Sequence, residues 1–343
     1  MILARARRVL VDAENLRTPD ECERIGLTVL GRACDQLCLP FPDVRKIVDN
    51  RNSVCLRVDG AGQRYLLKVN RHPNSGEVRG AARRMNTVAE VDTKGAFLVP
   101  RAHYIDNEYD AALMDFIDGV RLDTLLQRNR DPDAQFRYVR RAARALAVVH
   151  NLSLAEPDVA LKLPASDLVR DVSAEFPKFA RRNADALDRM ASVDDGPEVS
   201  IHGDFSPKNL IFDADGMIHL IDFSHPLDSV SPLRDISIFA IGMASAIMMA
   251  RPVDAMASDA TVEELIQGFV SEYLATTGYT AQERDTLCER LVLFELLRLA
   301  ETRIWINGYR CFREGMGGWL KSRLGQLFIV LQLRRLQSRI RAA

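Results

Sequence analysis

Residues 200–224 read SIHGDFSPKNLIFDADGMIHLIDFS, and this is the most informative stretch of the chain. It opens with His202-Gly203-Asp204 and continues to Asn209, five positions after Asp204. Two short apolar runs then flank an Asp-Ala-Asp-Gly turn, a pattern typical of a β-hairpin. The two ends of the predicted hairpin carry Asn209 and Asp222.

The oxygen-bearing side chains of this stretch indicate phosphoryl transfer. A carboxylate and an amide oxygen on opposite ends of a hairpin can meet at one Mg²⁺ ion, a hard cation that prefers oxygen ligands. Asp204 lies in the loop that leads into the hairpin, where its carboxylate can face a hydroxyl nucleophile. Transfer of a γ-phosphoryl group needs both a Mg²⁺ ion on the phosphates and a carboxylate near the attacking hydroxyl. The alternative is a solvated loop and turn, in which Asp and Asn are common.

The chain before the hairpin predicts a β-rich unit preceded by one helix. Thr18-Pro19-Asp20-Glu21 has the pattern of a capping box and predicts a helix that runs to about Cys38. Residues 45–118 then predict strands and one further helix. These elements are a hairpin of Val54–Val58 and Tyr65–Val69, a helix from a capping box at Asn74–Glu77 to about Val91, and strands at Phe97–Tyr104 and Ala111–Phe116.

After Gly119 the pattern becomes helical almost throughout. Asp131-Pro132 and the Thr-x-x-Glu patterns at Thr261 and Thr280 predict helix starts. The apolar run Ile236–Ala250 is too short to span a bilayer and predicts a buried helix. We therefore expect an α+β chain with a small β-rich lobe and a large, mostly helical lobe. The expected domains are a helical extension (1–44), a nucleotide-binding lobe (45–118), a lobe with the catalytic loop, metal site and acceptor pocket (119–318), and a basic amphipathic helix (319–343).

Composition excludes several classes of protein. Lys plus Arg number 46 and Asp plus Glu 47, so the near-zero net charge gives no support for nucleic-acid binding. Hydrophobic residues make up 47% of the chain, which argues against general disorder. The six cysteines lack the spacing of a zinc site, and Met1–Leu10 lacks the pattern of a signal peptide. We expect reduced thiols and a cytoplasmic protein.

Residues 200–224 resemble the catalytic and metal-binding segments of the protein-kinase-like superfamily. The resemblance is to the aminoglycoside phosphotransferase and choline kinase branch, which has HGD where protein kinases have HRD. The order of elements extends it over roughly residues 45–310. It implies a bilobal kinase-like fold, Mg²⁺, and transfer of a phosphoryl group from ATP or GTP to a hydroxyl of a small molecule. An antibiotic, an amino alcohol, a sugar or a cell-envelope precursor is an equally allowed acceptor.

The resemblance also implies roles for individual residues. Asp204 would be the catalytic base or hydroxyl-orienting carboxylate, and Asn209 and Asp222 would bind Mg²⁺. Lys68 matches the strand lysine that contacts the α- and β-phosphates. Glu77 matches the helix glutamate that pairs with that lysine.

Further positions match the supporting parts of such a site. Met114 would lie next to the adenine pocket, with backbone groups of Asp115 and Ile117 bonding adenine. His202 would hold the catalytic loop, and Asp235 would brace it from the following helix. The expected phosphate loop near residues 49–54 has no glycine, so phosphate contacts fall to Asn52 and Ser53.

Two other functions stay open. An atypical protein kinase is disfavoured because the short segment between Asp222 and Asp235 leaves no room for the usual activation segment. A non-catalytic module on a kinase-like fold is disfavoured because a scaffold needs no Mg²⁺ site. Acidic and aromatic residues suited to a cationic acceptor are candidates by type and region only, and Arg298 and Arg303 alternate with some of them. These candidates are Asp228, Glu295, Glu301, Trp305 and Tyr309.

The last segment, 319–343, contains six basic residues and no acidic one. Leu324, Leu327, Phe328 and Leu331 would form an apolar stripe on a helix. The favoured interpretation is a last helix packed on the large lobe, with a solvated basic face. The alternative is a helix that makes weak contact with a membrane surface or a partner.

Overall fold

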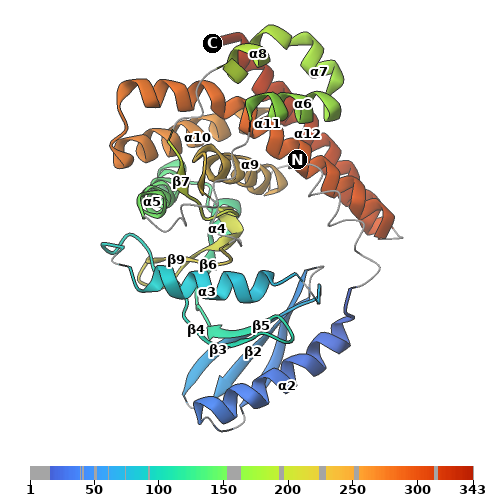
Figure 1. Cartoon of the computed structure of the whole chain (residues 1–343). Coiled ribbons are helices and arrows are strands. Elements are labelled where there is room, and N and C mark those ends of the chain that lie inside the picture. Colours follow the sequence, from blue (N-terminus) through green and yellow to red (C-terminus); the bar gives the residue numbers. More distant parts are fainter. Residues whose placement is uncertain are drawn as a thin grey trace. The chain divides into compact units, whose positions relative to one another are not determined.

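A computed structural model of the chain describes residues 16–342 except positions 39, 41, 50–51, 61, 74, 92, 153–163, 193–196, 224–228, 251–254 and 313–315. The described residues form two compact units (Figure 1). The strand unit comprises residues 16–121 with 209–223, and the helical unit comprises residues 122–208 with 229–342. Each unit is described by itself.

The strand unit is built on a five-stranded antiparallel sheet of order β1-β2-β3-β5-β4. A second sheet of order β6-β8-β9 belongs to the same unit. Its elements are α2 (Pro19–Leu37), β1 (Asp43–Asp49), β2 (Ser53–Gly60), β3 (Gln63–Asn70), α3 (Glu77–Ala89), β4 (Ala102–Asp106), β5 (Ala111–Asp115), β6 (Val120–Arg121), β8 (Leu210–Phe212) and β9 (Ile218–Leu220).

The core of the strand unit lies between α2 and the five-stranded sheet. Cys22, Val29 and Leu30 of α2 pack with Leu56 and Leu67 of the sheet. The helix begins with the expected capping box, because Thr18 and Glu21 exchange hydrogen bonds at its first turn. The sequence pattern thus predicts both the start and the buried face of α2.

The helical unit consists of helices with a short strand pair. Its elements are α4 (Leu122–Arg128), α5 (Pro132–Asn151), α6 (Ala165–Glu175), α7 (Pro177–Arg182), α8 (Ala184–Ser192), β7 (Val199–Ser200), η2 (Pro207–Asn209, whose last residue belongs to the strand unit), β10 (Ser229–Val230), α9 (Leu233–Ala250), α10 (Ala255–Thr277), α11 (Ala281–Phe312) and α12 (Met316–Ala342). The pair is formed by β7 and β10.

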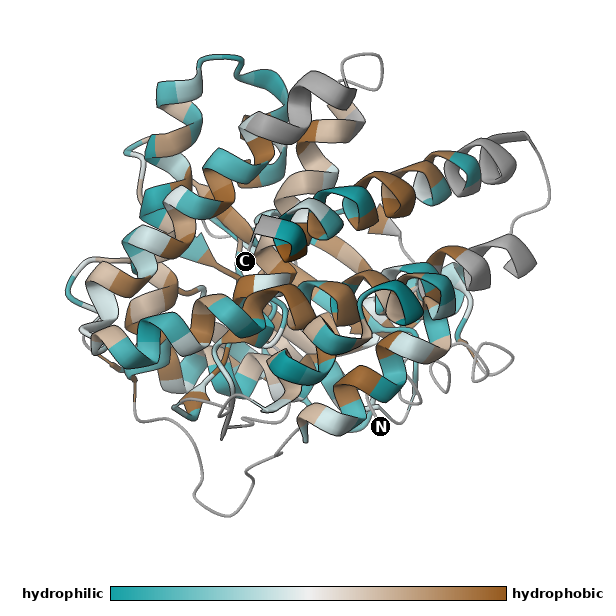
Figure 2. Ribbon diagram, turned by 90° about the horizontal axis from the view of Figure 1, so that it is seen from above, coloured by the Kyte–Doolittle hydropathy of each residue, from teal (hydrophilic) through white to brown (hydrophobic). Residues whose placement is uncertain are grey.

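Helix α9 forms the centre of the helical unit, and the prediction of a buried helix over Ile236–Ala250 is confirmed. Ile236, Phe239 and Met243 are buried, and the ring of Phe239 stacks on Phe269 of α10 with 4.1 Å between centroids. Many other helices carry hydrophobic and hydrophilic residues side by side, as amphipathic helices do (Figure 2). No described helix is long and apolar enough to cross a membrane.

Three expected boundaries are wrong. The strand expected at Phe97–Tyr104 is β4, which begins only at Ala102, because Pro100 has no N–H for a ladder. The capping box expected at Thr261 lies inside α10. The N-cap of α3 is Gly76, which has a φ of 68° and no capping side chain of its own.

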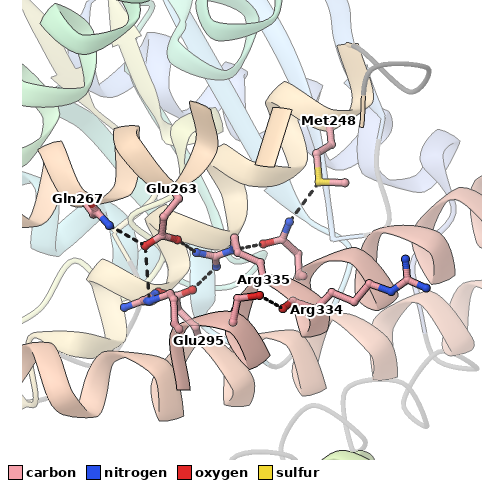
Figure 3. A network of polar contacts seen from close by, with 9 residues as sticks. Met248, Glu263, Gln267, Glu295, Arg334 and Arg335 are labelled. Carbon is pink, nitrogen blue, oxygen red and sulfur yellow. Dashed lines mark hydrogen bonds and ion pairs between the residues drawn. The ribbon is translucent and has the colours of Figure 1, made fainter. Parts of the chain in front are cut away.

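The C-terminal segment forms the packed last helix that the sequence favours. Helix α12 packs on α11, with Phe328, Leu331 and Leu336 buried. Two arginines of α12 bond acidic residues of the neighbouring helices. Arg335 lies between Glu263 of α10 and Glu295 of α11 (Figure 3). Arg339 also bonds Glu295. Contact of this segment with a membrane stays a prediction.

Candidate active site

The strand unit brings Lys68 and Asp222 together. Lys68 lies near the end of β3, and its Nζ is 2.5 Å from Oδ1 of Asp222. Asp222 follows β9 and has a φ of 58°, the left-handed region that only a few per cent of non-glycine residues occupy. An observed outlier of this kind is a reason to suspect a functional role. The structure thus joins two site residues that are 154 positions apart in the chain.

Asn209 and Asp222 lie at the same end of the β8–β9 hairpin. The N–H of Ile221 donates to the Asn209 carbonyl at 3.1 Å, which closes this end of the hairpin next to Asp222. Both residues carry side-chain oxygens, and the carboxylate of Asp222 is part-exposed. An amide oxygen and a carboxylate oxygen fit Mg²⁺, which takes one or two protein ligands and completes its shell with phosphates and water.

Helix α3 presents an arginine to this end of the strand unit, a residue that the sequence patterns did not single out. Arg84 is 4% exposed, and its guanidinium lies 5.7 Å from the ring centroid of Phe223, the residue after Asp222. Glu77, expected to pair with Lys68, is instead exposed at the first position of α3. The ion pair that the structure shows for Lys68 is the one with Asp222, and the role of Glu77 toward Lys68 stays a prediction. Arg84 is four positions from each of Gly80 and Val88, which are buried on the same helix face. This spacing was the signal in the sequence that could have indicated a buried arginine.

At Asp115, the last residue of β5 and a predicted adenine contact, the backbone hydrogen bonds depart from those of a regular antiparallel pair. The N–H of Asp115 donates to the Arg101 carbonyl at 2.9 Å, whereas the N–H of Arg101 donates to the Asp115 side chain at 2.8 Å. In a regular antiparallel pair the second bond goes to the carbonyl. His103 holds the other carboxylate oxygen at 2.7 Å. The backbone carbonyl of Asp115 thus takes part in neither of these two hydrogen bonds with Arg101.

The other residues predicted to contact the nucleotide have clear places in the strand unit. Met114 is buried in β5 opposite Leu66 of β3, and Ile117 follows the end of β5. Ser53 is the buried first residue of β2, and the carbonyl of the exposed Asn52 accepts the N–H of Arg71 at 2.8 Å. Their roles toward a nucleotide stay predictions.

In the helical unit a buried carboxylate holds the loop that carries Asp204. Asp235, in the first turn of α9, accepts the N–H groups of His202 at 2.6 Å and of Gly203 at 2.9 Å. His150 of α5 approaches the same carboxylate at 3.2 Å. The Asp204 N–H donates to Nδ1 of the buried His202 at 3.3 Å. These are the contacts that loop-bracing roles of Asp235 and His202 require.

The environment of Asp235 favours its ionised form. Burial alone would raise the pKa of this carboxyl, but the hydrogen bond and charge of His150, with the contacts from His202, hold the pKa below its ordinary value. The carboxylate therefore stays charged inside the helical unit. It can accept the loop N–H groups as strong, charge-assisted hydrogen bonds.

Asp204 itself is part-exposed and lies beside a lysine. Nζ of Lys208 is 3.2 Å from Oδ2 of Asp204. Helix α9 passes close behind this loop at Gly242, where an added Cβ would lie 2.9 Å from Cδ of Pro207. A glycine is needed there for the loop to lie this near the helix. The arrangement presents a carboxylate that can orient a hydroxyl and take up its proton.

The acidic candidates for an acceptor pocket have arginine partners. Glu295 is fully buried and bonds Arg335 and Arg339 of α12. Glu301 bonds Arg298 at 2.8 Å and lies 3.8 Å from Arg234. The side chains of the remaining candidates lie outside the described residues; these are Asp228, Trp305 and Tyr309.

Comparisons with known proteins agree with this geometry. The chain is similar to a thermostable variant of aminoglycoside phosphotransferase APH(4)-Ia, solved as a ternary complex with ADP and hygromycin B: 16% identity, 90% of this chain and 98% of that one covered, TM-score 0.54. It is similar to choline kinase from Cryptosporidium parvum (12% identity, 97% of each chain covered, TM-score 0.55). It is also similar to Plasmodium vivax ethanolamine kinase (14%, 86% and 81%, TM-score 0.52).

At these identities the solved structures show the fold alone, which is the kinase-like fold that the sequence predicts. A search of curated proteins found no significant match. The family model described as "Phosphotransferase enzyme family" matches residues 43–245, more than half of the chain. The matched range includes Lys68, Asp204, Asn209 and Asp222. The chain belongs to this phosphotransferase enzyme family.

Proposed function

We propose that the protein is a small-molecule kinase that transfers the γ-phosphoryl group of ATP to a hydroxyl of its acceptor. The observation that carries the proposal is the Lys68–Asp222 ion pair at the hairpin end that also bears Asn209. Family membership and the kinase-like fold support it. The ADP in the related APH(4)-Ia structure favours ATP as the donor.

The proposed reaction assigns one task to each residue. Lys68 binds the α- and β-phosphates, while the backbone after β5 and Met114 contact the adenine. Asn209 and Asp222 would hold Mg²⁺, which supplies neutralisation of phosphate charge when bound. Asp204 orients the acceptor hydroxyl and takes up its proton. The acceptor oxygen forms a bond to the γ-phosphorus, the bond from that phosphorus to the β-phosphate oxygen breaks, and ADP leaves.

Asp204 supplies the test of this proposal. Asp204→Ala removes the carboxylate but leaves Lys68, Asn209 and Asp222 in place. We expect the variant to keep the binding of Mg²⁺ and ATP, and to transfer phosphoryl groups about 100-fold more slowly or worse. The measurement is ADP release with a panel of hydroxyl acceptors that includes hygromycin B, choline, ethanolamine and sugars. Full activity of Asp204→Ala would overturn the mechanism. ATP binding without transfer to any acceptor would favour a non-catalytic module.

A further inference from the structure

Behind the Asp204 loop, a buried histidine connects Asp235 to a tyrosine of α10. His150 lies near the end of α5 and makes a contact with each ring nitrogen. Its Nε2 lies 3.2 Å from Oδ2 of Asp235, and its Nδ1 lies 2.8 Å from the hydroxyl oxygen of Tyr273. Tyr273 is fully buried, and its ring meets the imidazole edge to face with 5.5 Å between centroids. Three buried side chains of the helical unit are therefore joined by hydrogen bonds.

The charge of Asp235 decides which nitrogen of His150 carries a proton. An ionised carboxylate only accepts hydrogen bonds, so Nε2 of His150 must be the donor in that contact. Nδ1 then faces the Tyr273 hydroxyl, which can donate to the neutral ring or accept from the charged one. Burial raises the pKa of Tyr273, so its hydroxyl stays protonated at neutral pH. The hydroxyl thus fixes the orientation of the imidazole.

The other contacts of Asp235 lead directly into the backbone that carries Asp204. Oδ2 of Asp235 accepts both the Nε2–H of His150 and the N–H of His202. Oδ1 accepts the N–H of Gly203, the residue before Asp204, at 2.9 Å. A turn of the Asp235 carboxylate would therefore move the backbone that aims Asp204. A displacement of about 1 Å at a reacting group can cost about 100-fold in rate.

A second tyrosine supports Tyr273 from the turn between α10 and α11. The hydroxyl of Tyr279 lies 3.3 Å from that of Tyr273, and the two rings are in edge contact with 6.1 Å between centroids. Tyr279 is half-buried, and its backbone carbonyl accepts a hydrogen bond from Nε of Arg284 at 3.0 Å. Tyr279 thus contacts the Tyr273 hydroxyl on α10 but not the loop of Asp204 itself.

We infer that Tyr273 is a positioning residue for phosphoryl transfer, which acts through His150 to hold the Asp235 carboxylate in the orientation that aims Asp204. Tyr279 is its weaker support. The inference rests on the proposed kinase function and adds to its site a residue that no sequence pattern singled out. Its test needs one readout of the loop and one of the reaction.

Amide hydrogen exchange reads the loop without any acceptor. Tyr273→Phe removes only the hydroxyl, and we expect the His202 and Gly203 amides to exchange about tenfold faster or more, because their acceptor is less well held. The amides in the buried centre of α9 should keep their wild-type rates. Thr276→Val removes a hydroxyl from an exposed position of the same helix and is the matched control, expected to behave as wild type.

ADP release reads the reaction, with Mg²⁺, ATP and the fastest acceptor of the panel, or water where none reacts. We expect Tyr273→Phe to lower kcat about tenfold or more and to leave the KM for ATP within about twofold, because the nucleotide contacts lie in the strand unit. Tyr279→Phe should have a smaller effect. His150→Gln keeps an N–H donor for Asp235 and should retain more of the rate than His150→Leu.

Three results would overturn the inference. The first is unchanged exchange of the His202 and Gly203 amides in Tyr273→Phe. The second is an unchanged kcat in that variant, with a lower melting temperature alone, as a merely structural role predicts. The third is an equal loss of rate in His150→Gln and His150→Leu. Failure of the proposed function looks different, because the wild type would then show neither Mg²⁺-dependent stabilisation by ATP nor ADP release. The exchange rates would still decide whether Tyr273 holds the loop.

Discussion

At the scale of single residues, the contact between Lys68 and Asp222 carries most of the functional argument. The sequence predicts both residues, because the lysine ends an apolar strand and the aspartate ends a hairpin. It does not predict their pairing, because the two residues lie 154 positions apart in the chain. Glu77 lies in the exposed first turn of α3.

Replacement of Lys68 tests the nucleotide half of the site. We expect Lys68→Met to raise the KM for ATP about tenfold or more, because a charge-assisted contact to phosphate is lost. Lys46→Met is the matched control, since Lys46 of β1 pairs with Glu23. Steady-state kinetics or calorimetry with ATP measures the difference. An unchanged affinity for ATP in Lys68→Met would contradict the assigned role.

Asp235 makes stability depend on pH. Its pKa is held below the ordinary Asp value of about 3.9, so the ionised form stabilises the folded state above that pH. This contribution is lost as the pH falls through the lowered pKa. We expect the wild-type melting temperature to drop as the pH falls below about 4, and Asp235→Asn to be less stable at pH 7 with a shallower drop.

Thermal melts between pH 7 and pH 3 measure this dependence. Asp133→Asn, at an exposed position of α5, is the control and should follow the wild-type profile. An Asp235→Asn variant with the wild-type stability at pH 7 and the wild-type slope would contradict the account of the braced loop.

At the scale of elements, partners from distant parts of the chain decide the boundaries that sequence patterns miss. Helix α3 begins after Gly76, and the Asn74 of its predicted capping box lies outside the described residues. At this helix start the Asp110 carboxylate accepts the N–H of Arg79 at 2.8 Å and the Ser75 hydroxyl at 3.2 Å. Local patterns cannot show a cap that comes from more than thirty positions away. At Thr18 and Thr280, where the capping groups are local, the predicted helix starts are confirmed.

Ion pairs that are largely buried join helix α12 to α10 and α11. Figure 3 shows Arg335 of α12 between Glu263 and Glu295. Burial alone would raise the pKa of Glu295, but Arg335 and Arg339 hold it below its ordinary value. Removing Arg335 leaves the buried Glu295 carboxylate with Arg339 as its remaining partner among the described residues, so its burial is less well compensated. We expect Arg335→Met to lower the free energy of unfolding by about 3 kcal/mol.

Urea unfolding measures this loss, and the neighbouring arginine provides the control. Arg334 is exposed on the same helix, so Arg334→Met should change stability by less than about 0.5 kcal/mol. The double variant Glu295→Gln with Arg335→Met should regain part of the loss, because less charge is then left unpaired. Equal effects of Arg334→Met and Arg335→Met would contradict a buried clamp.

Gly119 allows β6 to pair with β8 in the strand unit. A Cβ at this position would lie 2.4 Å from the Phe212 carbonyl oxygen, so the backbone would have to shift. We expect Gly119→Ala to cost about 1–3 kcal/mol of stability. Gly31→Ala in α2, where an added Cβ meets nothing within 4 Å, should instead stabilise by about 0.5–1 kcal/mol. Comparison of the two melting temperatures decides whether the close approach at Gly119 matters.

At the scale of the whole molecule, the order of elements was predictable from the sequence and the acceptor was not. The hairpin motif, the strand lysine and the helical pattern after Gly119 led to an α+β, kinase-like chain. The observed elements and the similarity to solved structures confirm that fold, and the family match confirms the family. The surroundings of Asp204 depend on how α9 and α11 pack, which no local pattern specifies.

We propose that the strand unit binds ATP through a Mg²⁺ ion held by Asn209 and Asp222. The most direct test is thermal stabilisation by ATP and by GTP, each with and without Mg²⁺, in wild type and Asp222→Ala. A nucleotide at 100 times its Kd adds about 2.7 kcal/mol of stability, which is a shift of a few degrees. We predict a Mg²⁺-dependent rise with ATP in the wild type that disappears in Asp222→Ala. No rise with either nucleotide, or an equal rise in the variant, would contradict the claim.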